Sequence, residues 1–245
     1  MIRWRTLLPP EHGVWGFLAC GIAAALLAAP SWPGVIVALM LALSVCVRHG
    51  LRRGLVLHNR DLLLAALTVG VLCCGLGLLA LFLSSTWWWV PLVLATPFAI
   101  GQIICEQVRR EQQLPRSITE SIVGITALAA GGGAVALAGG ATPLVALQIA
   151  GIVSTYGACT VPYMRARLGR ENHQVSLETH ALGVVVAGSA YAAGANWCVA
   201  AIMLALSLRA FIALYRRRPK PVVAGLEELM VGLVIATCAG IGLHT

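Results

Sequence analysis

Two ionisable residues lie deep inside long apolar segments, where a charge needs a partner or a function. Arg209 precedes Arg216 by seven residues, which places it about 10 Å from the end of its helix at about 1.5 Å per residue. Glu228 lies seven residues after Pro221, at a similar depth on the next helix. Charges this deep in a membrane helix usually face the bundle interior or a wet cavity. The spacing predicts that Arg209 meets Glu228 or its neighbour Glu227, either as a structural pair or within a polar cavity.

A second basic group ends an apolar segment in the middle of the chain. Tyr163 is followed by Arg165 and Arg167, and Arg170 comes soon after. Residues two apart do not share a helix face, so the two arginines converge on one anion only if the helix frays at Gly169. Clustered arginines suit a phosphate or diphosphate, and they also serve as simple basic anchors. We expect Tyr163, Arg165, Arg167 and Arg209 to contact a ligand if one binds.

Acid–base chemistry at the same side of the chain would need a carboxylate or an imidazole. The candidates for a catalytic role are His12, Glu120 and Glu228, and Trp15 and His180 are further candidates for ligand contacts. A single histidine at a helix start is usually an interfacial residue. A haem would need paired histidines on facing helices, and only His12 and His180 make a plausible couple.

The elements that must position these residues are apolar helices. The chain is 59% hydrophobic and 11% charged, too few charges for the surface of a soluble protein. Helices satisfy their own backbone groups in lipid, so we expect one all-α membrane domain over residues 1–245. The nine expected spans cover residues 13–29, 33–47, 60–82, 86–105, 117–138, 142–163, 178–194, 195–215 and 222–243.

Apart from Arg209 and Glu228, charge is confined to one set of connectors and to the helix ends beside them. The alternate connectors contain no Lys, Arg, Asp or Glu, and they hold Trp32, Trp87–Trp89 and Trp197. By the positive-inside rule the charged side is the cytoplasm, and the tryptophans form a belt at the other interface. The prediction is a multi-pass bacterial inner-membrane protein with a cytoplasmic N-terminus. Much of the charge also suits the helix dipoles and needs no other role.

Composition and motifs argue against several function classes. The net charge of +8 follows the membrane topology, so we expect no nucleic-acid partner. The eight cysteines lie mostly in apolar spans without a CxxC pair, which is typical of small buried residues rather than of a metal site. The chain has no GxGxxG, Walker A or HExxH motif. We therefore expect no soluble cofactor and no bound metal.

The opening of the first span resembles that of a known family. Residues Pro10-Glu11-His12-Gly13-Val14-Trp15 match the P-x-H-G-x-W pattern of the YwiC-like membrane proteins. The Tyr163-x-Arg165-x-Arg167 stretch and the late Leu208-Arg209-Ala210 helix, followed by Gly225–Glu228, are similar to that family as well. The resemblance extends from the first span to the ninth. It implies a polytopic membrane protein and names no reaction.

A looser similarity is to the UbiA-type prenyltransferases. These enzymes also have nine helices, an inner N-terminus and a polar cavity facing the cytoplasm, and they bind magnesium diphosphate through two Asp-rich motifs. This chain has one aspartate, Asp61, and the corresponding places read Arg48-His49-Gly50 and Tyr163–Arg167. A magnesium bridge needs several oxygen ligands. The resemblance therefore implies a similar fold without the usual magnesium-dependent transfer.

Three functions fit these observations. In the first, the bundle binds a membrane lipid or an isoprenoid or quinone-like ligand whose polar head reaches the cytoplasmic rim, with or without a transferase reaction. In the second, it transports a small solute or protons, although no clear internal repeat of the transporter kind is visible. In the third, it is a structural or assembly partner of a membrane complex. The sequence names no protein partner.

Overall fold

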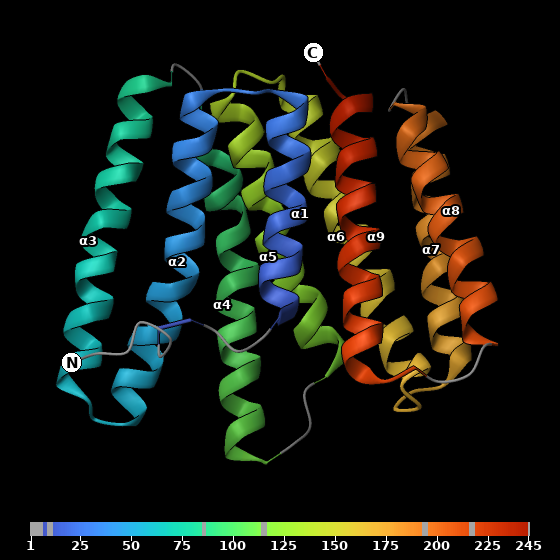
Figure 1. Cartoon of the computed structure of the whole chain (residues 1–245), viewed down its shortest axis with the longest axis horizontal. Helices are drawn as coiled ribbons and strands as arrows, with labels where there is room; N and C mark the ends of the chain where they lie inside the picture. Colours follow the sequence, from blue (N-terminus) through green and yellow to red (C-terminus); the bar gives the residue numbers. More distant parts are fainter. Residues whose placement is uncertain are drawn as a thin grey trace.

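The chain folds as an antiparallel helical bundle (Figure 1). The computed structural model describes residues 7–8, 12–84, 87–113, 117–192, 196–215 and 219–244. Within these residues there are nine α-helices and no β-strand. The helices are α1 (His12–Ala28), α2 (Trp32–Val56), α3 (Arg60–Leu83), α4 (Val90–Glu111), α5 (Ile118–Ala138), α6 (Pro143–Arg167), α7 (His173–Ala192), α8 (Trp197–Leu214) and α9 (Pro221–Gly242).

Local chemistry explains where most of the helices begin. Side-chain oxygens before the first turn accept backbone N–H groups that have no partner within the helix. These caps are Ser31 for α2, Asn59 for α3, Ser117 for α5, Thr142 for α6 and Asn196 for α8. Proline, whose missing N–H costs nothing in the first turn, opens α2, α6 and α9. The polar connectors therefore fix the helix starts that the apolar stretches alone leave open.

The core lies where α5 packs against α1, α2, α4 and α6. Residues 131–138 of α5 are buried except for one half-buried leucine. Gly132 faces Gly21 of α1 so closely that a Cβ atom on Gly132 would lie 3.0 Å from the Gly21 carbonyl oxygen. Small residues allow such backbone approach in membrane bundles. The glycine-rich stretch thus forms a helix–helix contact within the bundle.

The bundle has the dimensions and surface of a membrane protein. Seven helices, α2 to α6 together with α8 and α9, are long and apolar enough to cross a bilayer by length and composition. The seventeen-residue α1 is a shorter apolar helix. Large apolar side chains face outward, such as Phe82 at 88% exposure, as expected where lipid rather than water surrounds the protein.

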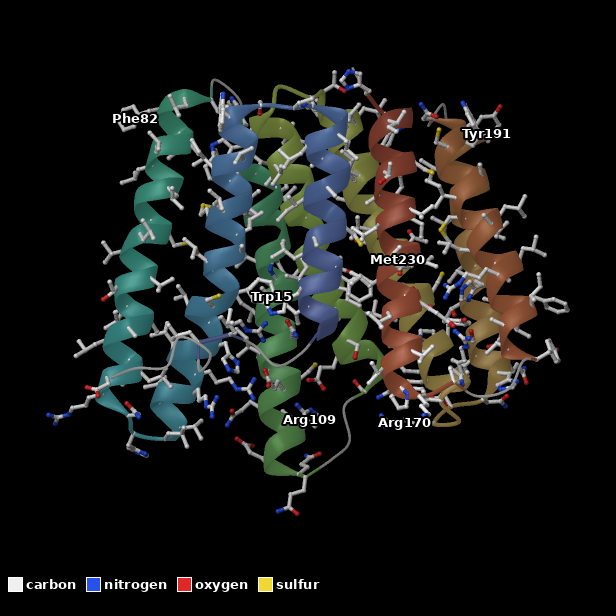
Figure 2. The ribbon with its side chains drawn as sticks, in the orientation of Figure 1. Trp15, Phe82, Arg109, Arg170, Tyr191 and Met230 are labelled. Atoms are coloured by element: carbon white, nitrogen blue, oxygen red, sulfur yellow. The ribbon has the colours of Figure 1, made fainter. Side chains whose placement is uncertain are left out.

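The described charges gather at one end of the bundle, which we call the charged end. Figure 2 shows Arg109 and Arg170 at this end and Phe82 and Tyr191 at the other. The helix ends show the same asymmetry. The helices that end at the charged end, α2, α4 and α6, carry arginines in their last turns, whereas α1, α3 and α5 end without them. The one-sided charge of the sequence is therefore one-sided in space.

Four helices differ from the sequence prediction by four or more residues at an end. The second span was expected at 33–47, but α2 continues to Val56 because Arg48 and Arg52 lie on a helix face that meets Glu106 of α4. The fourth was expected at 86–105, but α4 covers Val90–Glu111. The sixth was expected at 142–163, but α6 covers Pro143–Arg167. The seventh was expected from residue 178, but α7 begins at His173, where Asn172 accepts the Gln174 N–H. At the charged end polar residues extend these helices beyond the apolar stretch, whereas at its other end α4 begins four residues later than expected.

Candidate functional site

The deepest charges of the chain form an ion pair between neighbouring helices. Arg209 of α8 donates through Nη2 to Oε1 of Glu228 on α9. The Arg209 side chain is 26% exposed and the Glu228 side chain 10%. Tyr156 of α6 donates its hydroxyl to the Glu228 backbone oxygen at 2.9 Å and lies 3.4 Å from Oε2. The predicted meeting of Arg209 and Glu228 is thus present, and a third helix supports the carboxylate.

Tyr163 joins this pair to a second one. Its ring lies below two guanidinium groups, with the Arg209 Cζ 5.0 Å and the Arg167 Cζ 5.9 Å from the ring centroid. Arg167 pairs with Glu227 on α9. Cations over an aromatic face are attracted by the ring quadrupole. Tyr163 therefore holds two arginines from different helices, and both bond to adjacent glutamates of α9.

Some polar atoms around Tyr163 remain unsatisfied. Tyr163 is 1% exposed, and its hydroxyl oxygen has no hydrogen-bond partner among the described residues. The same holds for Nε of Arg167 and Oγ of Ser176. Buried polar atoms without partners are uncommon and cost free energy. These donors are available to a ligand or a water.

His180 of α7 completes the group. Its ring meets the Tyr163 ring edge-on at 6.1 Å between centroids. Its Nδ1 lies 2.7 Å from the Ser176 backbone oxygen, which can only accept, so Nδ1 carries the proton. We call the side chains of Tyr156, Tyr163, Arg167, His180, Arg209, Glu227 and Glu228 the polar cluster.

An apolar groove between α8 and α9 leads to the polar cluster. Its volume is about 470 Å³, and its lining includes Trp197, Leu206, Arg209, Met230 and Ile235. Arg209 is its only charged lining residue, and it lies twelve residues after Trp197, or about 18 Å along α8 at about 1.5 Å per residue. The groove exists because α8 packs chiefly against α7 and only lightly against α9. Figure 2 shows Met230 near mid-height of the bundle.

The remaining predicted site residues lie elsewhere. Arg165 is 3.9 Å from Glu171, and α6 continues to Arg167, so the two arginines do not converge on one anion. Glu120 of α5 is buried and receives Nε of Arg109 at 3.0 Å. Trp15 is partly buried in the first turn of α1. The ion pairs that Glu120 and Arg165 form with Arg109 and Glu171 thus involve residues outside the polar cluster.

Some of the expected residues fall outside the described side chains. His12 is the first residue of α1, but its side chain is not described, so its expected pairing with His180 is untested. Residues 9–11 and 216–218, which include Glu11 and three arginines, lie outside the described residues. Among the described residues no group of three or more His, Cys, Asp or Glu could hold a metal ion.

Two features of the site were not assigned from sequence. Tyr156 gave no signal beyond an aromatic residue in an apolar helix, although its hydroxyl supports Glu228. A second charged group, formed by Arg48 and Arg52 of α2 around Glu106 of α4, was interpreted as interfacial charge. The four-residue spacing of Arg48 and Arg52 places them on one helix face and was the available signal.

The fold and the polar cluster define a class of protein, a multi-pass helical protein of the membrane. The chain belongs to the YwiC-like family, since the model of that family, described as YwiC-like protein, matches residues 8–138. No curated protein and no solved structure matches the chain. The matched residues run through α5, so the polar cluster on α6–α9 lies beyond them. The similarity to UbiA-type enzymes, and the family likeness of the later motifs, stay predictions.

Proposed function

We propose that this protein binds a lipophilic ligand of the isoprenoid or quinone-like class. Its tail lies in the groove between α8 and α9, and its polar head reaches Arg209. The proposal includes a bacterial inner-membrane location with the charged end in the cytoplasm, following the positive-inside rule. One observation carries it: a single charged side chain stands at the end of an otherwise apolar groove. That arrangement matches an amphipathic molecule with one polar end.

The chemistry of the polar cluster supports this type of head group. A guanidinium has five N–H donors, and Glu228 accepts from one nitrogen of Arg209, which leaves donors for a carbonyl or an anionic oxygen. The Tyr163 hydroxyl and Arg167 Nε, which have no hydrogen-bond partner among the described residues, belong to the same polar cluster, and the Tyr163 ring centroid lies 5.0 Å from the Arg209 Cζ. Arg165, which pairs with Glu171, is not part of this head-group site.

The proposal is one of binding and assigns no reaction. Glu228 is the acid–base candidate within reach of Arg209, whereas Glu120 is paired with Arg109 on α4. A UbiA-like arrangement of the nine helices remains part of the hypothesis. A transporter or a structural partner of a membrane complex is the alternative, and neither requires a ligand that stays bound during purification.

Native mass spectrometry of the protein in mild detergent tests the proposal. Ala201 lines the groove eight residues before Arg209 on the same helix, about 12 Å at about 1.5 Å per residue, so Ala201→Phe should fill the groove away from the ion pair. Leu208 is 61% exposed on the same helix and lies outside the lining, so Leu208→Phe is the matched control. We expect a bound isoprenoid or quinone-like mass in the wild type and in Leu208→Phe, and its loss in Ala201→Phe. A bare protein mass in all three would favour transport or a structural role.

A further inference from the structure

A second groove lies on the far side of the bundle from α8 and α9. It is bounded by α2, α3 and α4 and has a volume of about 670 Å³. It forms because α3 packs chiefly against α2 while α4 packs against α5, so α3 and α4 do not close over α2. Figure 1 shows α3 at the edge of the bundle, with α2 beside it. The groove therefore opens toward the surrounding lipid.

The groove has a basic rim on α2. Arg48 contributes Nη1 to Gln102 at 3.1 Å and Nη2 to Glu106 at 3.4 Å, and Arg52 pairs with the other oxygen of Glu106. The carboxylate is 14% exposed, whereas the Arg48 and Arg52 side chains are 47% and 38% exposed. Glu106 thus holds both guanidinium groups in place while many of their N–H donors remain accessible.

The net charge of the groove lining matches one singly charged anion. Its charged members are Arg48, Arg52 and Glu106, which sum to +1. Two arginines one turn apart on a helix suit the paired oxygens of a phosphate. A phosphodiester carries one negative charge and would neutralise the rim.

The rest of the lining is mostly apolar, with Ser44 and Gln107 as its polar members. On α2 it runs from Ser44 to Val56, about 18 Å at about 1.5 Å per residue, with Arg48 and Arg52 between its two ends. Its walls include Val47, Leu51 and Ile103. A free phosphate would make no use of these walls, whereas acyl chains would cover them.

We propose that the groove between α2, α3 and α4 binds an anionic phospholipid of the leaflet at the charged end. The phosphate bonds to Arg48 and Arg52, and the acyl chains lie along the apolar walls between α2 and α3. Glu106 is a positioning residue that fixes the two arginines. This site is independent of the ligand proposed for α8 and α9, and it differs from it in requiring a phosphodiester.

The test measures lipid binding to delipidated protein by native mass spectrometry, with phosphatidylglycerol and phosphatidylcholine of identical acyl chains. The variant is Arg48→Gln/Arg52→Gln. The matched control is Arg53→Gln/Arg60→Gln, which removes the same charge from exposed residues near the same end but outside the lining. We expect the wild type and the control to prefer phosphatidylglycerol, and the variant to bind it about tenfold or more weakly. Equal weakening in both double variants, or no preference for phosphatidylglycerol, would overturn the proposal.

A second pair of variants leaves the arginines intact in case the first variant does not fold. Gly70 lines the groove, and a Cβ there would lie 3.7 Å from Val47, whereas a Cβ on Gly75 of the same helix meets nothing within 4 Å. Gly70→Leu should block the acyl chains and reduce phosphatidylglycerol binding, and Gly75→Leu should not. Inorganic phosphate at the lipid concentration should not displace the lipid. Displacement by phosphate, or unchanged binding to Gly70→Leu, would contradict a phospholipid site.

Discussion

Arg209 and Glu228 meet between antiparallel helices, and the Tyr156 hydroxyl from a third helix bonds to the same glutamate. Arg209 lines the apolar groove, and Glu228 is buried outside the groove lining. A charge in such a place is costly without its partner. The pair therefore links α8, which otherwise packs lightly against α9, to the core of the bundle.

Removing one partner of this pair should destabilise the protein far more than removing both. We expect Arg209→Gln or Glu228→Gln to lower the free energy of unfolding by about 3–5 kcal/mol, because each leaves a buried charge unpaired. The double variant should lose much less. Thermal melting of the purified protein in one detergent measures all three. Wild-type melting of both single variants would show that the pair contributes nothing to stability.

Tyr156→Phe tests the support from α6. Tyr156 is 3% exposed, and its hydroxyl donates to the Glu228 backbone oxygen. Its loss removes this bond, whereas the backbone oxygen keeps its place in the hydrogen-bond ladder of α9 and the ring keeps its contact with Phe17, so we expect a loss of about 1 kcal/mol. Tyr191→Phe, which alters a residue 55% exposed, is the control and should melt like the wild type. An equal shift in both would argue against the hydrogen bond.

The close approach of α1 and α5 should be intolerant of one methyl group. A Cβ on Gly132 would lie 3.0 Å from the Gly21 carbonyl oxygen and 3.1 Å from its Cα, and backbone atoms cannot move aside as a side chain can. We expect Gly132→Ala to cost about 1–3 kcal/mol. Gly151→Ala in α6, where a Cβ meets nothing within 4 Å, should be neutral or stabilising. The melting temperatures of the two variants in one detergent test this prediction, and equal melting would contradict it.

The sequence predicts the helices well because hydropathy and charge report burial in lipid directly. It also predicts the Arg209–Glu228 contact, since two charges at matched depth on adjacent helices have few other partners. It does not predict which acid each remaining arginine meets, because that depends on how helices distant in sequence pack. Glu106 of α4 receives Arg48 and Arg52 of α2, and no spacing within either segment encodes this choice.

The sequence also does not predict which of two nearby arginines, Arg165 or Arg167, is buried. Substituting each in turn therefore compares a buried arginine with a more exposed one on the same helix. Arg167 is buried, with its side chain 9% exposed, and pairs with Glu227 on α9. The Arg165 side chain is 29% exposed and lies 3.9 Å from Glu171, whose side chain is 30% exposed. Solvent screens such a half-exposed pair, so it contributes little.

We therefore expect Arg167→Ala to lower stability by about 1–3 kcal/mol, since it removes a buried guanidinium above Tyr163, whereas its partner Glu227, with a side chain 44% exposed, stays hydrated. Arg165→Ala should cost less than Arg167→Ala, because the Arg165 side chain is 29% exposed and that of Arg167 is 9% exposed. The two variants carry the same charge change two residues apart, so a difference in melting temperature reports position alone. If both melt alike, the assignment of Arg167 to the polar cluster and of Arg165 to the surface is wrong.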